Sequence, residues 1–558
     1  MLYPRSNKYR DVYTLNGIWR FKIVDDDYVP TAPAKDCSLM AVPASYNDIV
    51  TDRAAKEHVG KILYETTFTV PIRENRLYRL RIGATSHKCE VYLNGKPIGS
   101  GINGFFPIDL PLAELTEYNR LSVVIDNRLS FQTLPPGKVE NGRQLYNHDF
   151  YNFAGIHRDV LVYTLPQNHI RDIRIQTVVG GDYSMISVSV DTDCKRVSCK
   201  VQDADNQTVA AGSDGLLKIK NPQKWSCEHP YLYTLVVETG SDKYEETFGI
   251  RKVHVDEKGF YLNDEPVYFK GFGMHEDFFV LGKGNNAAVN MRNFELLKWM
   301  HANSFRTSHY PYSEEIMDLA DRYGFLVIDE VPAVGMHWWD DYNFGPDKVN
   351  GETAVLHKEL IKQLIERDKN HPSVVMLSVA NEPATHEEAA GAYFKDVIAY
   401  AKSVCELPIT LVEFTKFTEN SLVMDLVDVV CLNRYYGWYT DHACIDVVCA
   451  QFQEELHAYY NAVKKPIIVT EFGADSLEGV HALPAETFSE EFQEEYLVEN
   501  FKAIDSCEGC IGEHVWNFAD FKTKEGLRRA RGNRKGVFTR DRQPKLAAHF
   551  LRKRWENK

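Results

Sequence analysis

The sequence has no apolar run long enough to cross a bilayer, which takes about 20 residues. Residues 1–5 (MLYPR) also lack the apolar core of a signal peptide. Acidic residues outnumber basic residues, and the formal net charge is −15. An acidic chain argues against nucleic acid as a partner and is not attracted to anionic membranes. We therefore expect a cytoplasmic protein that binds neither nucleic acid nor membrane.

The cysteines lack the spacing of a disulfide framework or of a zinc site. There are 11 of them, and only Cys507 and Cys510 form a Cys-x-x-Cys pair, without a second pair or a histidine cluster. His386-Glu387 begins a zinc-protease pattern, but Ala390 stands where the second histidine belongs. The sequence therefore predicts reduced thiols and no metal site.

At 558 residues the chain is too long for a single core, so we expect more than one domain.

The first part of the chain has almost no helical periodicity. Asn94-Gly95 is a hairpin signal. Short β-strand patterns cover residues 62–70, 77–82, 89–93 and 121–125. We predict an N-terminal jelly-roll β-sandwich over residues 1–168.

A second β-rich segment follows, with alternating apolar and polar residues. Examples are residues 184–190, 199–201 and 231–238. This pattern predicts a small immunoglobulin-like β-sandwich over residues 169–253. It carries no recognisable catalytic group, and we interpret it as a spacer.

From residue 254 to 558 the pattern changes to strands that alternate with helices. Residues 356–365, for example, place their apolar side chains on one helical face. Eight such strand–helix units predict a C-terminal (β/α)8 TIM barrel, whose active site lies at the carboxyl ends of the strands. The predicted strands are residues 267–271, 304–308, 325–329, 374–379, 409–413, 429–433, 467–470 and 512–516.

Two of these strands end in glutamates. Glu382 follows the fourth strand and Glu471 follows the seventh, so both project into the same barrel mouth. A buried carboxylic acid has a raised pKa and suits general acid catalysis. Two carboxylates facing each other are what glycoside hydrolysis requires. The alternative is that each carboxylate only forms a structural salt bridge.

The residues around these glutamates resemble a known enzyme family. Asn-Glu-Pro at residues 381–383 and Thr-Glu-Phe-Gly at residues 470–473 are similar to glycoside hydrolases of family 2, and within them to bacterial β-glucuronidases. The resemblance covers essentially the whole chain. It implies that Glu382 is the acid/base, that Glu471 is the nucleophile, and that the reaction retains anomeric configuration without a cofactor.

The resemblance also implies several sugar contacts. It assigns Asp149, in the polar and aromatic segment 148–158, to the sugar site. Asn381 is expected to donate to the sugar 2-hydroxyl. Alternatively, the segment is a loop that packs against the next domain, and Asn381 satisfies strand-end backbone groups. The resemblance also implies that three aromatic residues line the sugar site, namely Tyr435, Tyr439 and Trp516. Alternatively, they belong to the hydrophobic core, as aromatic residues in a barrel mouth do equally often. Two further candidates are His275 and His309.

A basic cluster at residues 522–535 indicates the sugar. Within it, Asn533 and Lys535 match the Asn-x-Lys pair that binds the glucuronic acid carboxylate in β-glucuronidases, and Arg529 is a third candidate. Alternatively, the cluster is a solvated loop. At Met274 the chain departs from the family, which usually carries a basic residue there, so the contact made from that position is in doubt.

The predicted substrate is a glucuronide of a small molecule or of a glycan end. Alternatives are another family 2 glycosidase (a β-galacturonidase or a β-galactosidase), a catalytically silent carbohydrate-binding protein, and a metal-dependent barrel hydrolase. The loop of residues 332–353 contains Trp338, Trp339, Tyr342 and Phe344. It is a candidate platform for the leaving group or a candidate subunit interface. We also expect a homo-oligomer, either a dimer or a tetramer.

Overall fold

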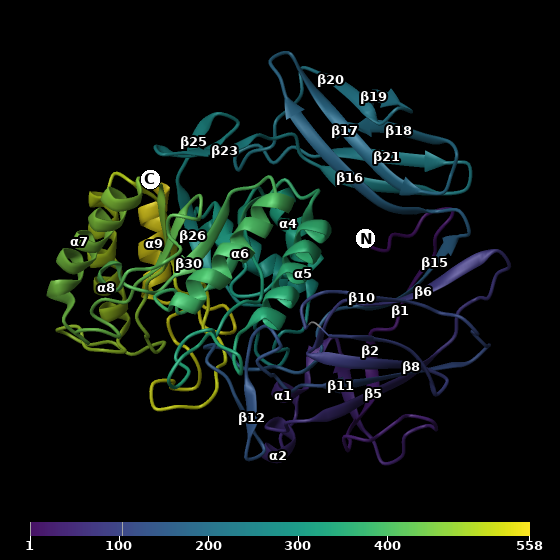
Figure 1. Ribbon diagram of the computed structural model, residues 1–558, viewed down its shortest axis with the longest axis horizontal. Helices are drawn as coiled ribbons and strands as arrows, with labels where there is room; N and C mark the ends of the chain where they lie inside the picture. Colours follow the sequence, from purple (N-terminus) through teal and green to yellow (C-terminus); the bar gives the residue numbers. More distant parts are fainter. Residues whose placement is uncertain (1, 103) are drawn as a thin grey trace.

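The computed structural model describes residues 2–102 and 104–558. The chain forms a barrel and two β-sandwiches (Figure 1). In this view the barrel lies at the left, the second sandwich at the top and the first sandwich at the lower right. The predicted domain boundaries, after residues 168 and 253, stay a prediction.

The first domain is a sandwich of two antiparallel sheets, and the predicted jelly-roll β-sandwich is confirmed. Asn94 and Gly95, with φ of 52° and 84°, connect β8 (Lys88–Leu93) to β9 (Lys96–Gly101) as the hairpin signal predicted. The larger sheet has the order β3 (Ser38–Val42), β2 (Gly17–Ile23), β5 (Lys61–Phe68), β11 (Asn119–Asp126), β8 (Lys88–Leu93) and β9 (Lys96–Gly101). The smaller sheet has the order β1 (Val12–Thr14), β15 (Val160–Pro166), β6 (Arg76–Ile82) and β10 (Ile108–Pro111).

Short elements complete this domain. They are β4 (Ala44–Ser45), β7 (Thr85–Ser86), β14 (Gly155–Ile156), β12 (Lys138–Glu140), β13 (Arg143–Leu145), α1 (Tyr46–Ile49) and α2 (Arg53–Lys56).

The second domain is the predicted immunoglobulin-like sandwich. Its strands alternate as predicted: Ile186 and Val188 are buried, whereas Ser187 and Ser189 are exposed. One sheet has the order β16 (Ile170–Val179), β17 (Tyr183–Thr192) and β20 (Leu216–Lys220). The other has the order β19 (Thr208–Gly212), β18 (Val197–Gln202), β21 (Tyr233–Thr239) and β22 (Lys243–Phe248).

The third domain is a closed parallel barrel, which confirms the predicted TIM barrel. Its strands are β26 (Phe269–Gly273), β27 (Ser304–Arg306), β28 (Leu326–Glu330), β29 (Val374–Asn381), β30 (Ile409–Glu413), β31 (Val430–Asn433), β32 (Ile467–Glu471) and β33 (Cys510–Val515). The helices between and after them are α3 (Ala287–Trp299), α4 (Glu314–Tyr323), α5 (Gly351–Asp368), α6 (Glu388–Val404), α7 (Ile445–Val463), α8 (Glu490–Ser506) and α9 (Leu546–Glu556).

The structure corrects two details of the predicted barrel. Val267, which we placed in the first barrel strand, belongs to β25 (Glu265–Val267), because the turn at Asn263 and Asp264 pairs this segment with β24 (Gly259–Leu262). These strands and β23 (Val253–Asp256) form a separate small sheet.

The fifth strand–helix unit is the second correction. Between β30 and β31 the chain forms only the 3-10 helix η1 (Phe417–Glu419). The left-handed Asn420 follows, in a segment whose turn-forming residues favour a short connection.

The first domain packs directly on the barrel. Phe105 and Phe150 belong to the same buried cluster as the barrel residues. The backbone amide of Tyr151 donates to the carbonyl of Lys522 over 2.8 Å. Segment 148–158 is thereby brought to the barrel mouth.

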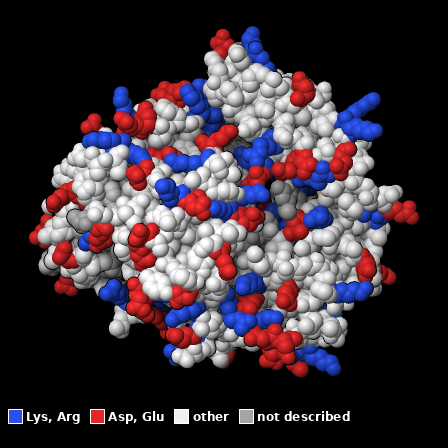
Figure 2. All heavy atoms as spheres, viewed as in Figure 1, with Lys and Arg blue, Asp and Glu red and all other residues white. Residues whose placement is uncertain are grey.

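Charges are mixed over the surface. On the face shown in Figure 2, Lys and Arg side chains are interspersed with Asp and Glu side chains. Among the helices formed by residues 2–102 and 104–558, none is long and apolar enough to span a membrane.

Candidate active site

A cavity of about 390 Å³ lies among the carboxyl ends of the barrel strands and the segment that reaches them from the first domain. Its volume is typical of a small-molecule site. Barrel strands direct their ends to one mouth, so residues far apart in the sequence meet there. The predicted site residues that line it are Asp149, His309, Asn381, Glu382, Tyr435, Tyr439, Glu471, Trp516 and Arg529.

Glu471 is the last residue of β32 and is 4% exposed. Arg306 Nη2 donates to its Oε1 over 2.5 Å, and the Tyr435 hydroxyl donates to its Oε2 over 2.6 Å. Burial raises the pKa of Glu471 to about 6, while the Arg306 charge and the Tyr435 hydrogen bond oppose this rise. This environment favours an ionised carboxylate at neutral pH.

Glu382 directly follows β29, with a φ of 50° that is uncommon for a residue other than glycine. Asn433 Nδ2 donates to its Oε1 over 2.8 Å. Burial and the negative charge of Glu471 raise the pKa of Glu382 to about 8, against the opposite effect of Asn433. At neutral pH the site therefore holds one protonated and one ionised carboxyl group, as an acid and a nucleophile require.

Two amide side chains in the mouth, those of Asn381 and Asn433, belong to residues at irregularities of their strands. The register shifts at Asn381 in β29 and at Asn433 in β31, and such bulges re-aim side chains next to active sites. Arg306 Nη1 and Asn433 Nδ2 each donate to Asn381 Oδ1 over 3.2 Å. Because two donors hold this oxygen, the Asn381 amide NH2 group is left to donate to a ligand.

A carboxylate-binding cluster lies at one side of the mouth. The Arg529 guanidinium donates two hydrogen bonds to the Asp149 carboxylate, from Nε to Oδ1 over 2.9 Å and from Nη2 to Oδ2 over 2.5 Å. Asn533 Nδ2 donates to the same Oδ2 over 3.0 Å, and Arg529 Nη2 also donates to the Tyr439 hydroxyl over 2.8 Å. Two predicted carboxylate ligands therefore hold the carboxylate of a third predicted site residue.

Lys535 lies behind this cluster and is fully buried. Its Nζ donates to the Tyr439 hydroxyl over 3.0 Å and to Asp475 Oδ1 over 3.2 Å. The ammonium also lies 4.9 Å from the centre of the Trp438 ring. Lys535 and Asn533 thus do not line the cavity themselves. They contact Tyr439 and Asp149, which do.

Trp516 and His309 form part of the buried cavity floor. The two ring centroids are 5.1 Å apart at 34°. His309 Nδ1 lies 3.3 Å from Glu330 Oε1, and its Nε2 lies 3.9 Å from Glu471 Oε1. Burial and the Arg306 charge hold the pKa of His309 well below 6.5, so the ring is neutral.

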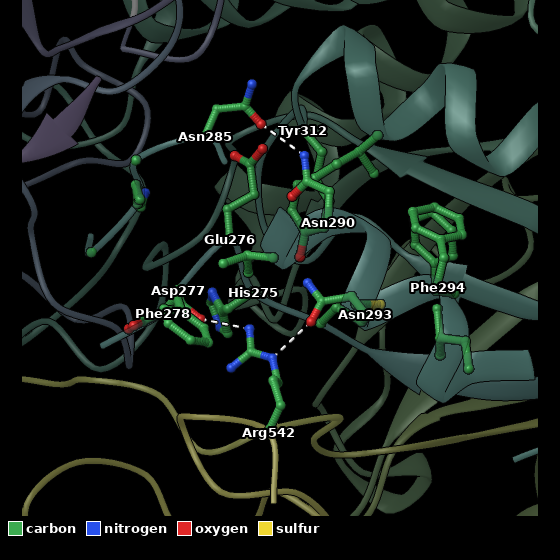
Figure 3. Close-up of a pocket in the computed structure, with 18 residues that line it drawn as sticks. His275, Glu276, Asp277, Phe278, Asn285, Asn290, Asn293, Phe294, Tyr312 and Arg542 are labelled. Carbon is green, nitrogen blue, oxygen red and sulfur yellow. Dashed lines mark hydrogen bonds between the residues drawn. The ribbon is translucent and has the colours of Figure 1, made fainter. Parts of the chain in front are cut away.

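His275 and Met274 line a different, smaller cavity of about 30 Å³ (Figure 3). Figure 3 shows Arg542 directed at Asn293 on the border of this cavity, where Nε donates over 2.7 Å. His275 Nδ1 lies 3.1 Å from the Tyr310 hydroxyl. The structure thus places His309 among the residues that line the larger cavity, whereas His275 and Met274 do not line it.

The loop of residues 332–353 divides its aromatic residues between two places. Trp338 lines the larger cavity and is 52% exposed. Phe344 is buried, with its ring 5.2 Å from Tyr393 and 5.8 Å from Phe394. The loop therefore contributes one ring to the cavity and another to the hydrophobic core.

Sequence reasoning missed four polar residues of this network. They are Arg306, Glu330, Asn433 and Asp475. Arg306 lies inside a predicted buried strand (304–308), where a charge is unusual and was the available signal. Its Nη1 donates to Glu330 Oε1 over 2.8 Å, which links two carboxylates of the mouth.

Three family models match successive parts of the chain. They are described as the sugar binding domain of glycosyl hydrolases family 2 (residues 12–166), glycosyl hydrolases family 2 (158–251), and the TIM barrel domain of that family (253–558). The chain belongs to glycoside hydrolase family 2. The resemblance of residues 381–383 and 470–473 to this family is thereby confirmed.

Relatives of this family 2 glycoside hydrolase match it over its whole length. A "Beta-glucuronidase" of Paenibacillus borealis is 43% identical, covering 100% of this chain and 98% of the relative. The solved structure of an "Uncultured Clostridium sp. Beta-glucuronidase" has a TM-score of 0.97 at 43% identity and covers 100% of both chains. A β-glucuronidase from Ruminococcus gnavus in complex with uronic isofagomine has a TM-score of 0.95 at 39% identity, covering 99% of both.

Proposed function

We propose that this family 2 enzyme hydrolyses β-D-glucuronides with retention of configuration, with Glu382 as acid/base and Glu471 as nucleophile. Glu471 attacks the anomeric carbon while Glu382 gives its proton to the departing glycosidic oxygen. The resulting glucuronyl ester on Glu471 is then hydrolysed. Glu382 takes a proton from the attacking water, and the Glu471 carboxylate leaves.

The observation that carries the sugar assignment is the carboxylate held at the cavity mouth. Arg529 and Asn533 already bind the carboxylate of Asp149 with three hydrogen bonds of 2.5 to 3.0 Å. A guanidinium that binds with two nitrogens matches the geometry of a carboxylate. The fully buried ammonium of Lys535 adds a positive charge behind them. These groups suit the C5 carboxylate of a uronic acid better than the hydroxymethyl group of a neutral hexose.

The similar proteins support the same sugar. Those reported above are β-glucuronidases by name, and one is described in complex with uronic isofagomine, a uronic-type ligand. A β-galacturonide would present the same carboxylate and differs at one hydroxyl. The galacturonide therefore remains the alternative that an assay must test.

We assign the remaining cavity residues to sugar binding. Asn381 donates its amide hydrogens to the 2-hydroxyl, an interaction that strengthens in the transition state. Trp516 offers a buried ring to the sugar ring. Tyr435 holds Glu471 through its hydroxyl, and Tyr439 orients Arg529 and Lys535.

A panel of 4-nitrophenyl glycosides tests the proposal. The β-glucuronide is expected to be cleaved with the highest kcat/KM, ahead of the β-galacturonide, β-glucoside and β-galactoside. NMR of the first product formed should show the β-anomer, which establishes retention. A higher kcat/KM on a neutral sugar would overturn the carboxylate assignment, and an α-product would overturn the retaining mechanism.

Two broader expectations complete the proposal. We expect the enzyme to act in the cytoplasm on glucuronides of small molecules or of glycan ends. We also expect a homo-oligomer, either a dimer or a tetramer, and size-exclusion chromatography with light scattering tests this directly.

A further inference from the structure

The buried part of the cavity and its exposed rim offer different chemistry. Glu471 and Trp516 on the floor are both 4% exposed, whereas Trp338 is 52% exposed. A sugar bound against the two glutamates carries its leaving group outward, away from the floor. The rim residues therefore contact the leaving group.

Two aromatic rings stand on this rim. Trp338 belongs to the loop after β28, and Phe414 directly follows β30. Their ring centroids are 5.1 Å apart at 70°. Both residues line the cavity, so an edge of aromatic surface is open to a bound group.

Trp338 is held in place by its surroundings. Its φ is 62°, a left-handed conformation that is rare for a bulky side chain and persists where neighbouring structure imposes it. The His337 ring stacks on the Trp338 ring at 4.5 Å and 6°. Asn147 Nδ2, from the first domain, donates to the His337 carbonyl over 2.9 Å. A fixed, half-exposed indole is a platform for a flat apolar group.

Arg528 adds a positive charge to the same cavity. It is exposed and lines the cavity beside Arg529. The Arg529 guanidinium forms an ion pair with Asp149, within the cluster assigned above to the sugar carboxylate. By contrast, no ion pair or side-chain hydrogen bond involving the Arg528 guanidinium is found within residues 2–102 and 104–558. Its charge is therefore available to a ligand.

We propose that the leaving-group side of the cavity selects aromatic aglycones that carry an acidic group, with Trp338 and Phe414 holding the ring and Arg528 pairing with the anion. This inference rests on the proposed function, because the leaving group is defined by the bond that Glu382 and Glu471 break. The pairing lies at an exposed rim, so its effect on selectivity is moderate and decreases with salt.

Two substrates that differ only in one remote charge test the inference. They are 7-hydroxycoumarin-4-acetic acid β-D-glucuronide and the analogue whose acetic acid group is a methyl ester, with the sugar carboxylate free in both. The phenolic oxygens of the two coumarins are similar leaving groups. The quantity compared is the ratio of kcat/KM for the acid to kcat/KM for the ester. In Arg528→Gln this ratio should fall about three- to fivefold, in Arg528→Glu it should fall further, and Arg528→Lys should retain most of it. For the unaltered enzyme the ratio should also fall between about 0.05 M and about 0.5 M salt.

Arg531 provides the matched control, because it is exposed on the same loop but does not line the cavity. Arg531→Gln should leave the ratio within about twofold. Trp338→Ala should lower kcat/KM for both coumarins relative to methyl β-glucuronide and leave the ratio unaltered, with thermal unfolding checking that the variant is folded.

The outcomes separate the two proposals. A ratio that Arg528→Gln does not alter, or that Arg531→Gln alters equally, overturns the inference about the leaving group. If the unaltered enzyme cleaves neither coumarin glucuronide nor 4-nitrophenyl β-glucuronide, the proposed function itself fails.

Discussion

Asn433 Nδ2 lies 2.8 Å from Glu382 Oε1, although Asn433 is the register partner of Glu471 on the neighbouring strand. Glu382 thus receives a neutral amide donor, whereas Glu471 receives a tyrosine hydroxyl and an arginine guanidinium. This difference in donors separates the pKa values of two carboxyl groups that are both buried.

The pH dependence of kcat/KM should be bell-shaped, with an optimum between the two pKa values. Activity requires an ionised Glu471, so it should rise as the pH passes through about 6. It also requires a protonated Glu382, so it should fall as the pH passes through about 8. In Glu382→Gln the alkaline limb should disappear on activated aryl glucuronides. An unaltered alkaline limb in that variant would assign the limb to another group.

Replacing each carboxylate should have a distinct effect. Glu471→Ala should abolish turnover of all glucuronides and prevent covalent labelling by a 2-fluoro glucuronyl inactivator. Glu382→Ala should spare glycosylation by substrates whose leaving group needs no proton, such as activated phenols. Equal losses on good and poor leaving groups would contradict the acid role of Glu382. Glu413→Gln is a matched control, since Glu413 is a buried strand-end glutamate that is hydrogen-bonded to Thr385 and Ser421, away from the cavity.

The distance between the carboxyl groups of Glu382 and Glu471 should be that of a retaining enzyme, roughly 5–5.5 Å. Inverting enzymes separate these groups by about 6.5–9.5 Å to admit a water molecule. A crystal structure with a bound uronic-type inhibitor measures this distance. A value in the longer range would rule out a covalent intermediate on Glu471.

Tyr435→Phe should reduce kcat about 10- to 100-fold, because a hydrogen bond to a charged group contributes roughly 1.5–3 kcal/mol. The hydrogen bond from the Tyr435 hydroxyl lowers the pKa of Glu471. Removing the hydroxyl should therefore raise this pKa and move the acid limb of the pH profile to higher pH. Tyr436→Phe is the control, since the Tyr436 hydroxyl donates to Glu455 outside the cavity. A loss of activity with an unmoved acid limb would show that Tyr435 acts only in packing.

Asn533→Ala and Lys535→Ala should each reduce kcat/KM on aryl glucuronides by about 10- to 100-fold, and the corresponding glucosides should be affected much less. The double variant should lose at least the sum, because the substrate carboxylate then keeps Arg529 alone of these three partners. Lys545→Met removes another fully buried lysine, paired with Asp520 outside the cavity. It should lower stability without altering sugar selectivity. If glucuronide and glucoside rates fell together, the pair would serve only the structure of the mouth.

The sequence by itself was sufficient for the three-domain fold and for the positions of the two strand-end glutamates. Hydrophobic periodicity is a local property, so alternating residues such as 184–190 and the buried runs before Glu382 and Glu471 reveal strands without knowledge of their neighbours. The boundaries were less accurate where a turn competes with a strand, as at Val267, and where a short connection replaces a helix, as between β30 and β31.

Only the tertiary structure decided which side chains meet. Arg306 lies 165 residues from Glu471 in the sequence, and Asp149 lies 380 residues from Arg529. Such pairs depend on barrel closure and on the docking of the first domain, because no local pattern encodes a contact between distant strand ends. For the same reason the assignment of His275 to one cavity and His309 to the other was decided by packing. Local propensity determines the elements, whereas the desolvated charges that tune the two glutamates arise only when those elements pack together.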